Sequence, residues 1–212
     1  MSKLIKYVGP EWYHLLKPAF DKNWESIQKT IKTEKRNISP KLSQVFRCFQ
    51  ECPLRDLHTI IIAEGPYTST INNIPTADGL ALSVNPDIKG AIPYQAKHLY
   101  QATECQSNLT YVANQGVLLL NTALTCAGGV PGSHDSIWQA FIDDAFELIL
   151  KYDTGFNVVA IGNKAETLLE IHDLDNHVVF LNPDFDVEDW EEDFVDNVNN
   201  NLLKCNLTPI LW

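Results

Sequence analysis

The chain has 212 residues, of which 45% are hydrophobic and 20% charged, and its formal net charge is −11 at pH 7. This length and composition exclude a disordered protein and allow one substantial core, so we predict a single domain over residues 1–212. The opening residues carry no apolar run typical of a signal peptide, and no later stretch is long enough to span a bilayer. We therefore expect no membrane association and an intracellular location, in the cytoplasm or with the DNA of a nucleoid or nucleus.

Taken in chain order, the apolar patterns predict a helix over 11–31, a strand over 57–63, a polar loop over 68–78, a strand over 116–122, a helix over 134–151, a strand over 156–162, a helix over 164–172, a strand over 177–183 and a helix over 187–203. Continuous apolar strands that alternate with helices are typical of parallel sheets covered on both faces. The predicted fold is therefore α/β, with a central, mainly parallel four-stranded sheet flanked by helices.

The carboxyl ends of the strands are where functional groups gather in such folds. In this chain the residues just beyond those ends are 64–67, 121–122, 162–163 and 182–183. These four short segments are therefore the candidate site.

The charges are distributed unevenly along the chain. Residues 1–50 contain ten Lys or Arg against four acids, whereas residues 165–203 contain twelve acids and no Lys or Arg. Since duplex binding depends on neutralising phosphates, the acidic part should repel DNA unless it faces away from it. A solvated acidic surface is the simplest interpretation of this run.

The cysteines and histidines show no spacing typical of metal ligands. The five cysteines contain no CxxC pair, and complete pairing would leave one of them free. We expect a reducing compartment, no disulfide scaffold and no metal. No phosphate-binding loop or dinucleotide-binding glycine pattern is present either, and we expect no cofactor.

Two of the strand-end segments resemble a known family. The segment GPYTSTINNIPTADGLALSVNP (65–86) is similar to the water-activating segment of family-1 uracil-DNA glycosylases, and NQGVLLLNTALTCAGGVPGSHDSIWQAF (114–141) is similar to their uracil-reading strand and the helix after it. EWYHLL (11–16) and TPILW (208–212) also resemble the family's first helix and last residues. The resemblance implies a glycosylase fold and a base-flipping mode of DNA recognition.

The resemblance implies that part of the base pocket is retained. Asn121 matches the asparagine that reads uracil, and Tyr67 matches the tyrosine that excludes thymine. Pro66 and Ser83 match contacts to the backbone and phosphate near the flipped nucleotide. Leu82 replaces the stacking phenylalanine, which keeps an apolar contact but loses the aromatic face.

The groups that usually perform the chemistry are missing. The catalytic aspartate of the family falls on Gly65, and the histidine that stabilises the departing uracil anion falls on Asn182. The loop after it, which inserts leucine into DNA in the family, carries two carboxylates within 182–186. The serine-containing minor-groove loop is replaced by Ile-Pro-Tyr-Gln at 92–95. Three DNA-handling elements are thus altered in the direction of weaker DNA binding.

Three further residues are candidates with an alternative structural interpretation. Glu64 resembles the glutamate that assists water in a thermophile-type branch of the superfamily, and it is our tentative catalytic residue; it could equally cap the turn or face solvent. Ser133 and His134 match positions near the DNA, and His134 could instead be an ordinary residue at a helix N-terminus.

The leading hypothesis is a glycosylase fold that excises uracil weakly or not at all and binds a flipped pyrimidine in DNA, or a protein partner, in replication or repair. Some viral members of the superfamily act as scaffolds for a replicative polymerase, so a viral pseudoenzyme is one form of this hypothesis. The alternative is an active glycosylase on uracil or a modified pyrimidine that uses Glu64. A third possibility is a pocket for a free base or nucleoside, read by Asn121 and Tyr67.

Overall fold

The computed structural model describes residues 3–88, 107–153, 155–182 and 194–212. Its centre is a parallel sheet of four strands in the order β5-β2-β7-β8. The strands are β2 (Thr59–Ala63), β5 (Val117–Asn121), β7 (Asn157–Ile161) and β8 (Val178–Asn182). Every residue of β2, β5 and β7 is buried, which explains why these strands are continuous apolar runs. The predicted α/β class and parallel four-stranded sheet are confirmed.

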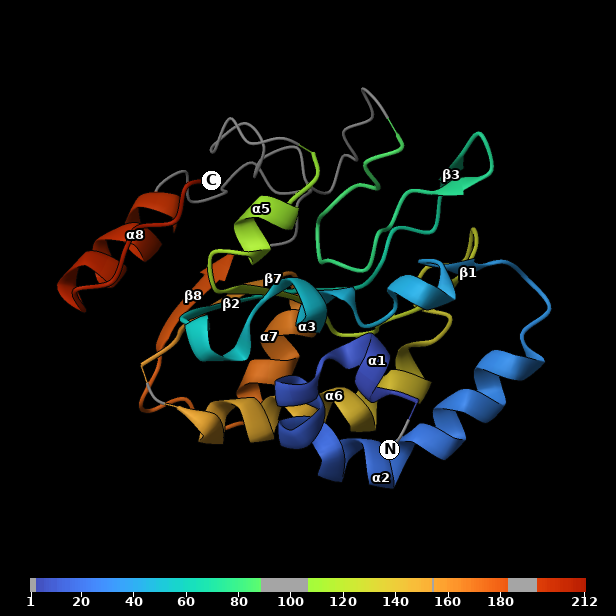
Figure 1. The fold of residues 1–212 in the computed structure, drawn as a ribbon, viewed down its shortest axis with the longest axis horizontal. Coiled ribbons are helices and arrows are strands. Elements are labelled where there is room, and N and C mark those ends of the chain that lie inside the picture. Colours follow the sequence, from blue (N-terminus) through green and yellow to red (C-terminus); the bar gives the residue numbers. More distant parts are fainter. Residues whose placement is uncertain (1–2, 89–106, 154, 183–193) are drawn as a thin grey trace.

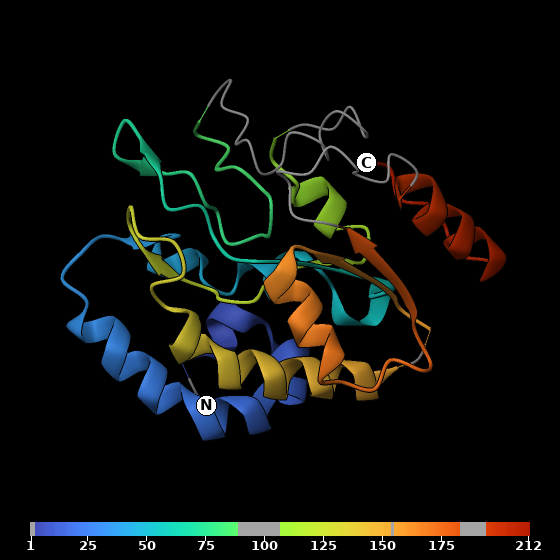
Figure 2. The same ribbon diagram turned by 180° about the vertical axis from the view of Figure 1, so that it is seen from behind.

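Helices cover both faces of this sheet (Figures 1 and 2). Helices α6 (Asp135–Tyr152) and α7 (Asn163–Glu170) lie on one side, with α2 (Pro10–Thr33) packed beyond α6. On the other side lie α5 (Thr110–Ala113) and α8 (Phe194–Lys204). The remaining elements are short: α1 (Ile5–Val8), α3 (Arg47–Glu51), the strand pairs β1 (Ile38–Ser39) with β6 (Cys126–Ala127) and β3 (Thr70–Ile71) with β4 (Ile74–Pro75), and 3₁₀ turns at Leu42–Gln44 and Leu54–Asp56.

Aromatic packing joins α2 to α6. Pro10 at the first position of α2 suits a helix start, because its missing N–H would have no partner there. The buried face of α2 brings Phe20 against Phe141 of α6, with ring centroids 4.8 Å apart. Trp138 of α6 contacts Phe141 in turn, at 5.6 Å. The two longest helices of the described chain are thereby held together on one side of the sheet.

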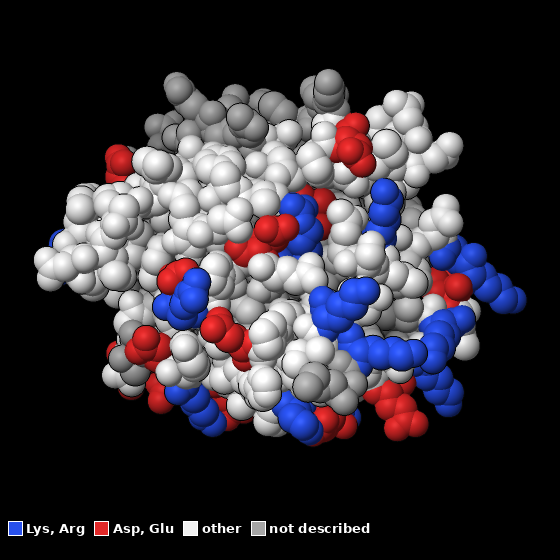
Figure 3. Space-filling view, viewed as in Figure 1, with Lys and Arg blue, Asp and Glu red and all other residues white. Residues whose placement is uncertain are grey.

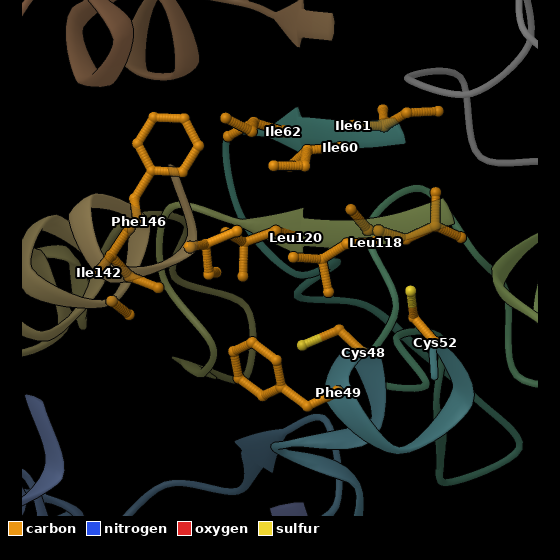
Figure 4. Packing of buried hydrophobic residues seen from close by; sticks show 14 of the residues in the cluster. Cys48, Phe49, Cys52, Ile60, Ile61, Ile62, Leu118, Leu120, Ile142 and Phe146 are labelled. Carbon is orange, nitrogen blue, oxygen red and sulfur yellow. The ribbon is translucent and has the colours of Figure 1, made fainter. Parts of the chain in front are cut away.

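The core between sheet and helices is continuous and largely apolar. Figure 4 shows side chains of β2 and β5 near side chains of α6 and of the α3 region, and the labelled members of this cluster include Ile60, Ile62, Leu118, Leu120, Ile142, Phe146, Cys48, Phe49 and Cys52. Burial raises the pKa of the Cys48 thiol to about 12, so this cysteine acts as a small apolar side chain. Among the described residues, Cys48, Cys52, Cys126 and Cys205 are free thiols.

A chain of polar side chains ties α8 to the amino end of the sheet. Asn201 donates to Oδ1 of Asn157 at 2.7 Å, and both Asn157 and Thr59 are fully buried. His58 contacts the Thr59 hydroxyl through Nδ1 at 2.8 Å, and its Nε2 donates to the Gln115 carbonyl at 2.7 Å. The buried polar groups of Asn157 and Thr59 therefore have partners at this end.

The predicted long elements agree with the structure to within a few residues. The predicted helix over 187–203 corresponds to α8 where the chain is described, and residues 187–193 lie outside the described part. No helix in the described residues combines the length and the apolar character needed to cross a membrane.

Candidate functional site

The carboxyl ends of the four strands are in register. Asn121 of β5 pairs with Ala63 of β2, Ala63 pairs with Ile161 of β7, and Ile161 pairs with Asn182 of β8. At about 4.8 Å per strand, Asn121 and Asn182 occupy positions about 14 Å apart on one row of the sheet. The turn that follows Ala63 begins between them. The sequence segments identified as candidates are thus brought to a single edge.

Asn121 is a buried amide without a complete set of partners. Its side chain is only 5% exposed, and its Oδ1 atom has no hydrogen-bond partner among the described residues. An unpaired buried carbonyl oxygen costs about 1–3 kcal/mol, so few are retained in a protein core without a use. A side-chain amide can both donate and accept, which suits it to read a base edge.

The turn after β2 is held by its neighbours on both sides. The Ser39 hydroxyl donates to the Tyr67 carbonyl at 2.7 Å, and Sγ of Cys126 lies 3.6 Å from the Pro66 carbonyl oxygen. The Thr122 hydroxyl donates to the Glu64 carbonyl at 2.5 Å. Strand β5 and the β1–β6 pair therefore fix the position of residues 64–67.

Gly65, where the resemblance places the lost aspartate, has free space around it. A Cβ atom built at Gly65 meets no heavy atom within 4 Å, and the residue does not have a positive φ. The backbone therefore does not require glycine at this position. A Cβ atom could be accommodated here without displacing a neighbour.

Tyr67 is half-buried, and its hydroxyl donates to the carbonyl of Leu82 at 2.8 Å. Leu82 is buried and has φ +65°, a left-handed conformation that costs a branched side chain about 1–2 kcal/mol. The preceding residue, Ala81, donates its N–H to the Leu119 carbonyl at 3.0 Å. The strained residue therefore follows a residue that is bonded to the middle of β5, two positions before Asn121.

A buried ion pair stabilises the segment 78–83, which contains Leu82. The carboxylate of Asp78 is fully buried, 2.6 Å from Nη1 of Arg47, and it accepts bonds from the Ser83 hydroxyl at 2.9 Å and the Asn108 amide at 2.9 Å. Ser83 is itself fully buried and accepts the Leu109 N–H at 3.0 Å. The hydroxyl of Ser83, which the resemblance assigns to phosphate, is thus engaged inside the protein.

Glu64 points toward the start of α7. Its Oε1 accepts the backbone N–H of Lys164 at 3.2 Å. A Cβ atom at Gly162 would lie 2.8 Å from Cγ of Glu64, so the close approach depends on glycine there. A carboxylate at a helix N-terminus is favourable, because it pairs with unbonded N–H groups and the helix dipole. This arrangement agrees with the capping interpretation of Glu64.

The two residues with a predicted DNA contact, His134 and Ser133, are buried and half-buried, respectively. His134 is 2% exposed and lies at the N-terminus of α6, with Nδ1 2.9 Å from the Thr125 hydroxyl and Nε2 3.5 Å from Oε2 of Glu34. The Ser133 hydroxyl accepts the N–H of Ala127 at 2.8 Å. Both side chains stabilise the loop between β5 and α6 in this structure.

Several predicted features fall outside the described residues. These are the 92–95 loop and residues 183–186 of the second motif; Asn182 is placed by its backbone at the end of β8. In the described part of the chain, no group of His, Cys, Asp or Glu side chains could hold a metal ion. A hollow of about 230 Å³ lies between α6 and α7, and its lining includes Thr122, but not Asn121 or Tyr67.

Two contributors to the site are not evident from the sequence. The Arg47–Asp78 pair joins residues 31 positions apart, and Ser39 contacts Tyr67 across 28 positions. Neither pair has a local pattern that could have predicted it. The sequence signal for the first pair is a single acidic residue, Asp78, inside the mainly apolar segment 77–84.

The fold is that of an α/β domain, with a buried, partly unpaired amide and a half-buried tyrosine at the carboxyl edge of its sheet. No family model matches the chain. Curated relatives do: the uracil-DNA glycosylase of Borrelia turicatae is 31% identical over 186 residues, which cover 81% of each chain. That of Lactiplantibacillus plantarum is 29% identical over 189 residues, covering 84% of this chain and 80% of the relative. The chain belongs to the uracil-DNA glycosylase family.

Solved structures agree on the fold. The uracil-DNA glycosylase of mimivirus superposes with a TM-score of 0.86 at 20% identity, covering 100% of this chain and 89% of the other. A variant of the same viral protein in complex with UGI gives a TM-score of 0.85 at 19% identity, covering 96% and 88%. The predicted glycosylase fold is therefore confirmed.

Proposed function

We propose that this member of the uracil-DNA glycosylase family binds a flipped pyrimidine nucleotide in DNA, in replication or repair, and excises uracil weakly or not at all. The observation that carries the proposal is the Asn121 amide, 5% exposed with an unpaired Oδ1, at the end of β5. An acceptor in this position suits the N3–H of a uracil or thymine ring. Tyr67 and Leu82 lie on the neighbouring segment, where they would bound the pocket.

Weak excision follows from the groups that the site lacks. Gly65 supplies no carboxylate to activate water, and Asn182 supplies at most an amide in place of an imidazole. General-base and electrostatic groups each contribute roughly 10²–10⁴-fold to a rate. Loss of both leaves binding as the principal activity of the retained pocket.

An active enzyme that uses Glu64 is less well supported. The carboxylate of Glu64 is engaged by the N–H of Lys164 at the start of α7. This bond directs Oε1 to the helix start, so a water molecule would have to bind to the remaining lone pairs of the carboxylate. The Glu64→Gln variant tests this alternative. If the wild-type protein excises uracil and Glu64→Gln does not, the active-enzyme alternative is favoured over the binding proposal.

A protein partner is the second candidate. The edge strand β8 exposes apolar side chains, with Val179 at 37% and Leu181 at 53%. An exposed apolar edge strand is a common element of protein interfaces. A variant of the mimivirus glycosylase forms a complex with UGI, so a protein of this fold can bind a partner.

Binding and excision should be measured on the same oligonucleotides. Fluorescence anisotropy on single strands containing one uracil or one thymine gives affinity, and alkali treatment of uracil strands reveals abasic sites. We expect tighter binding to the uracil strand, little or no cleavage, and loss of the uracil preference in Asn121→Ala. A lost buried hydrogen bond of about 1–3 kcal/mol corresponds to roughly 5- to 150-fold. Asn176→Ala, which removes an exposed amide, is the matched control.

Equal affinity for both strands in the wild type, or an Asn121→Ala variant that keeps the preference, would overturn the base-recognition proposal. Absence of any oligonucleotide binding would leave the protein-partner candidate. Efficient cleavage by the wild-type protein would establish an enzyme.

A further inference from the structure

Five exposed cations lie close together at the end of α2 and in the segment that follows it. We refer to them as the basic surface, which consists of Lys29, Lys32, Lys35, Arg36 and Lys41. Basic side chains gather at the right of the space-filling view, over this end of the molecule (Figure 3). The concentration is unusual in a chain whose net charge is −11.

The basic surface contains little negative charge of its own. Glu34 is the single acid between residues 29 and 41. Its carboxylate is bound by Arg36, with Nη2 2.8 Å from Oε2 and Nε 3.0 Å from Oε1, and it faces His134 at 3.5 Å. The four lysines form no ion pair with any carboxylate in the described chain. Their charge is therefore available to a partner.

The basic surface is attached directly to the candidate site. The Asn37 carbonyl accepts the N–H of Gly128 at 2.7 Å, and the next two residues form β1, which pairs with β6. Ser39 then donates to the Tyr67 carbonyl at 2.7 Å. Three consecutive residues between Arg36 and Lys41 are thus bonded to the loop after β5 or to the turn that carries Tyr67. The cations and the pocket form one connected region.

A phosphate backbone is the partner whose chemistry fits this region. Lys29 and Lys32 are about 4.5 Å apart along the helix axis, at 1.5 Å per residue. A nucleic-acid strand in a duplex carries one charge for about every 3.4 Å of axis, so consecutive phosphates could be met by consecutive lysines. Exposed, flexible lysines favour such sequence-independent contacts.

We propose that the basic surface binds the phosphates of the DNA strand that flanks the flipped nucleotide. This inference rests on the proposed function, since it extends the base pocket to the adjoining strand. It gives the chain a source of DNA affinity apart from the family loops at 92–95 and 182–186, whose sequences have lost their usual DNA-handling residues.

The test compares two triple variants that change the net charge equally. One is Lys32→Ala with Lys35→Ala and Lys41→Ala; the control is Lys6→Ala with Lys151→Ala and Lys204→Ala. All six lysines are exposed, so both variants should fold, which circular dichroism and thermal melting would verify. Affinity for a single-stranded oligonucleotide containing one uracil is measured by anisotropy at several salt concentrations.

If the three lysines contact three phosphates, the slope of log K against log[salt] should become shallower by about 2 in the basic-surface variant. The affinity should fall by about 10- to 100-fold near 0.1 M salt. The control should keep the wild-type slope. A third variant with the same three positions changed to Arg should restore the slope, because the charge is retained.

Equal losses in the two alanine variants would attribute the effect to total charge and overturn the inference. Unchanged affinity in the basic-surface variant, with the wild-type uracil preference intact, would overturn it and leave the proposed function standing. If the wild-type protein binds no oligonucleotide, both proposals fail together.

Discussion

The carboxylate of Asp78 lies 2.6 Å from Nη1 of Arg47, with no exposed surface on the aspartate and 14% on the arginine side chain. This pair links α3 to the segment that holds Leu82 in its left-handed conformation. Arg47 also bonds the Thr110 hydroxyl and Glu51, so the guanidinium connects α3, α5 and the pocket segment. The segment that contains Leu82 is thereby supported from inside the protein.

Removal of one partner of this pair should destabilise the protein strongly. We expect Arg47→Met to lower the free energy of unfolding by about 3–5 kcal/mol, because it leaves the Asp78 charge buried and unpaired. Urea unfolding followed by tryptophan fluorescence measures the change. As a control, Arg55→Ala removes an exposed arginine 3.7 Å from Asp56 and should cost less than about 1 kcal/mol. Similar losses in the two variants would contradict a structural role for the Arg47–Asp78 pair.

A carboxylate returned to position 65 should increase excision. The space around Gly65 accepts a Cβ atom, and the backbone there is not left-handed. We expect Gly65→Asp to raise the rate of uracil release from a single-stranded oligonucleotide by about 10²-fold, the lower end of the range for a general base, since Asn182 still replaces histidine. Gly65→Asn is the matched control, because it has the same size without the charge. Identical rates for the folded Asp and Asn variants would argue against a water-activating position here.

The long elements could be predicted because each has a distinct apolar pattern. Strands β2, β5 and β7 are buried on both faces and therefore appear as uninterrupted apolar runs, and α2 and α6 show helical spacing. The two-residue strands β1 and β6 have no such pattern, because their pairing is set by the loops that surround them.

The sequence predicted which residue types lie in the candidate site, but it did not predict the contacts between them. The resemblance pointed to Asn121 and Tyr67, and the parallel strands placed their segments at one edge. It did not predict that Ser83 would be fully buried against Asp78, or that Glu64 would bond to α7. Those contacts depend on packing between segments distant in the chain.

Glu64 should contribute to stability through α7. We expect Glu64→Ala to lower the free energy of unfolding by about 0.5–1 kcal/mol, because the helix start loses both a hydrogen-bond acceptor and a favourable charge. Glu64→Gln should lose less, since its amide oxygen can still accept from Lys164. Chemical denaturation measures both. Glu170→Ala is the control: it removes an acid at the opposite end of α7, where negative charge is not favoured, and should be neutral or slightly stabilising.

Acid should weaken the fold through three partly buried histidines. Burial lowers the pKa of His58, of His172 and of His177 below the ordinary value of 6.5. At a pH between 6.5 and the lower pKa values of the folded state, the unfolded chain binds more protons than the folded chain. The free energy of unfolding therefore decreases as the pH falls below 6.5. Above pH 6.5 this contribution of the histidines to stability is complete. We expect the urea midpoint to fall between about pH 7 and pH 5.5.

His58 allows this pH effect to be assigned. Its Nε2 donates to the Gln115 carbonyl, so Nδ1 of the neutral ring accepts from the Thr59 hydroxyl, and protonation of Nδ1 removes that acceptor. His58→Gln keeps a polar side chain without the titration and should reduce the dependence of the midpoint on pH. A steeper dependence in this variant would show that His58 does not contribute with the expected sign. The slope should persist at about 1 M salt, because burial, unlike surface charge pairing, is not screened.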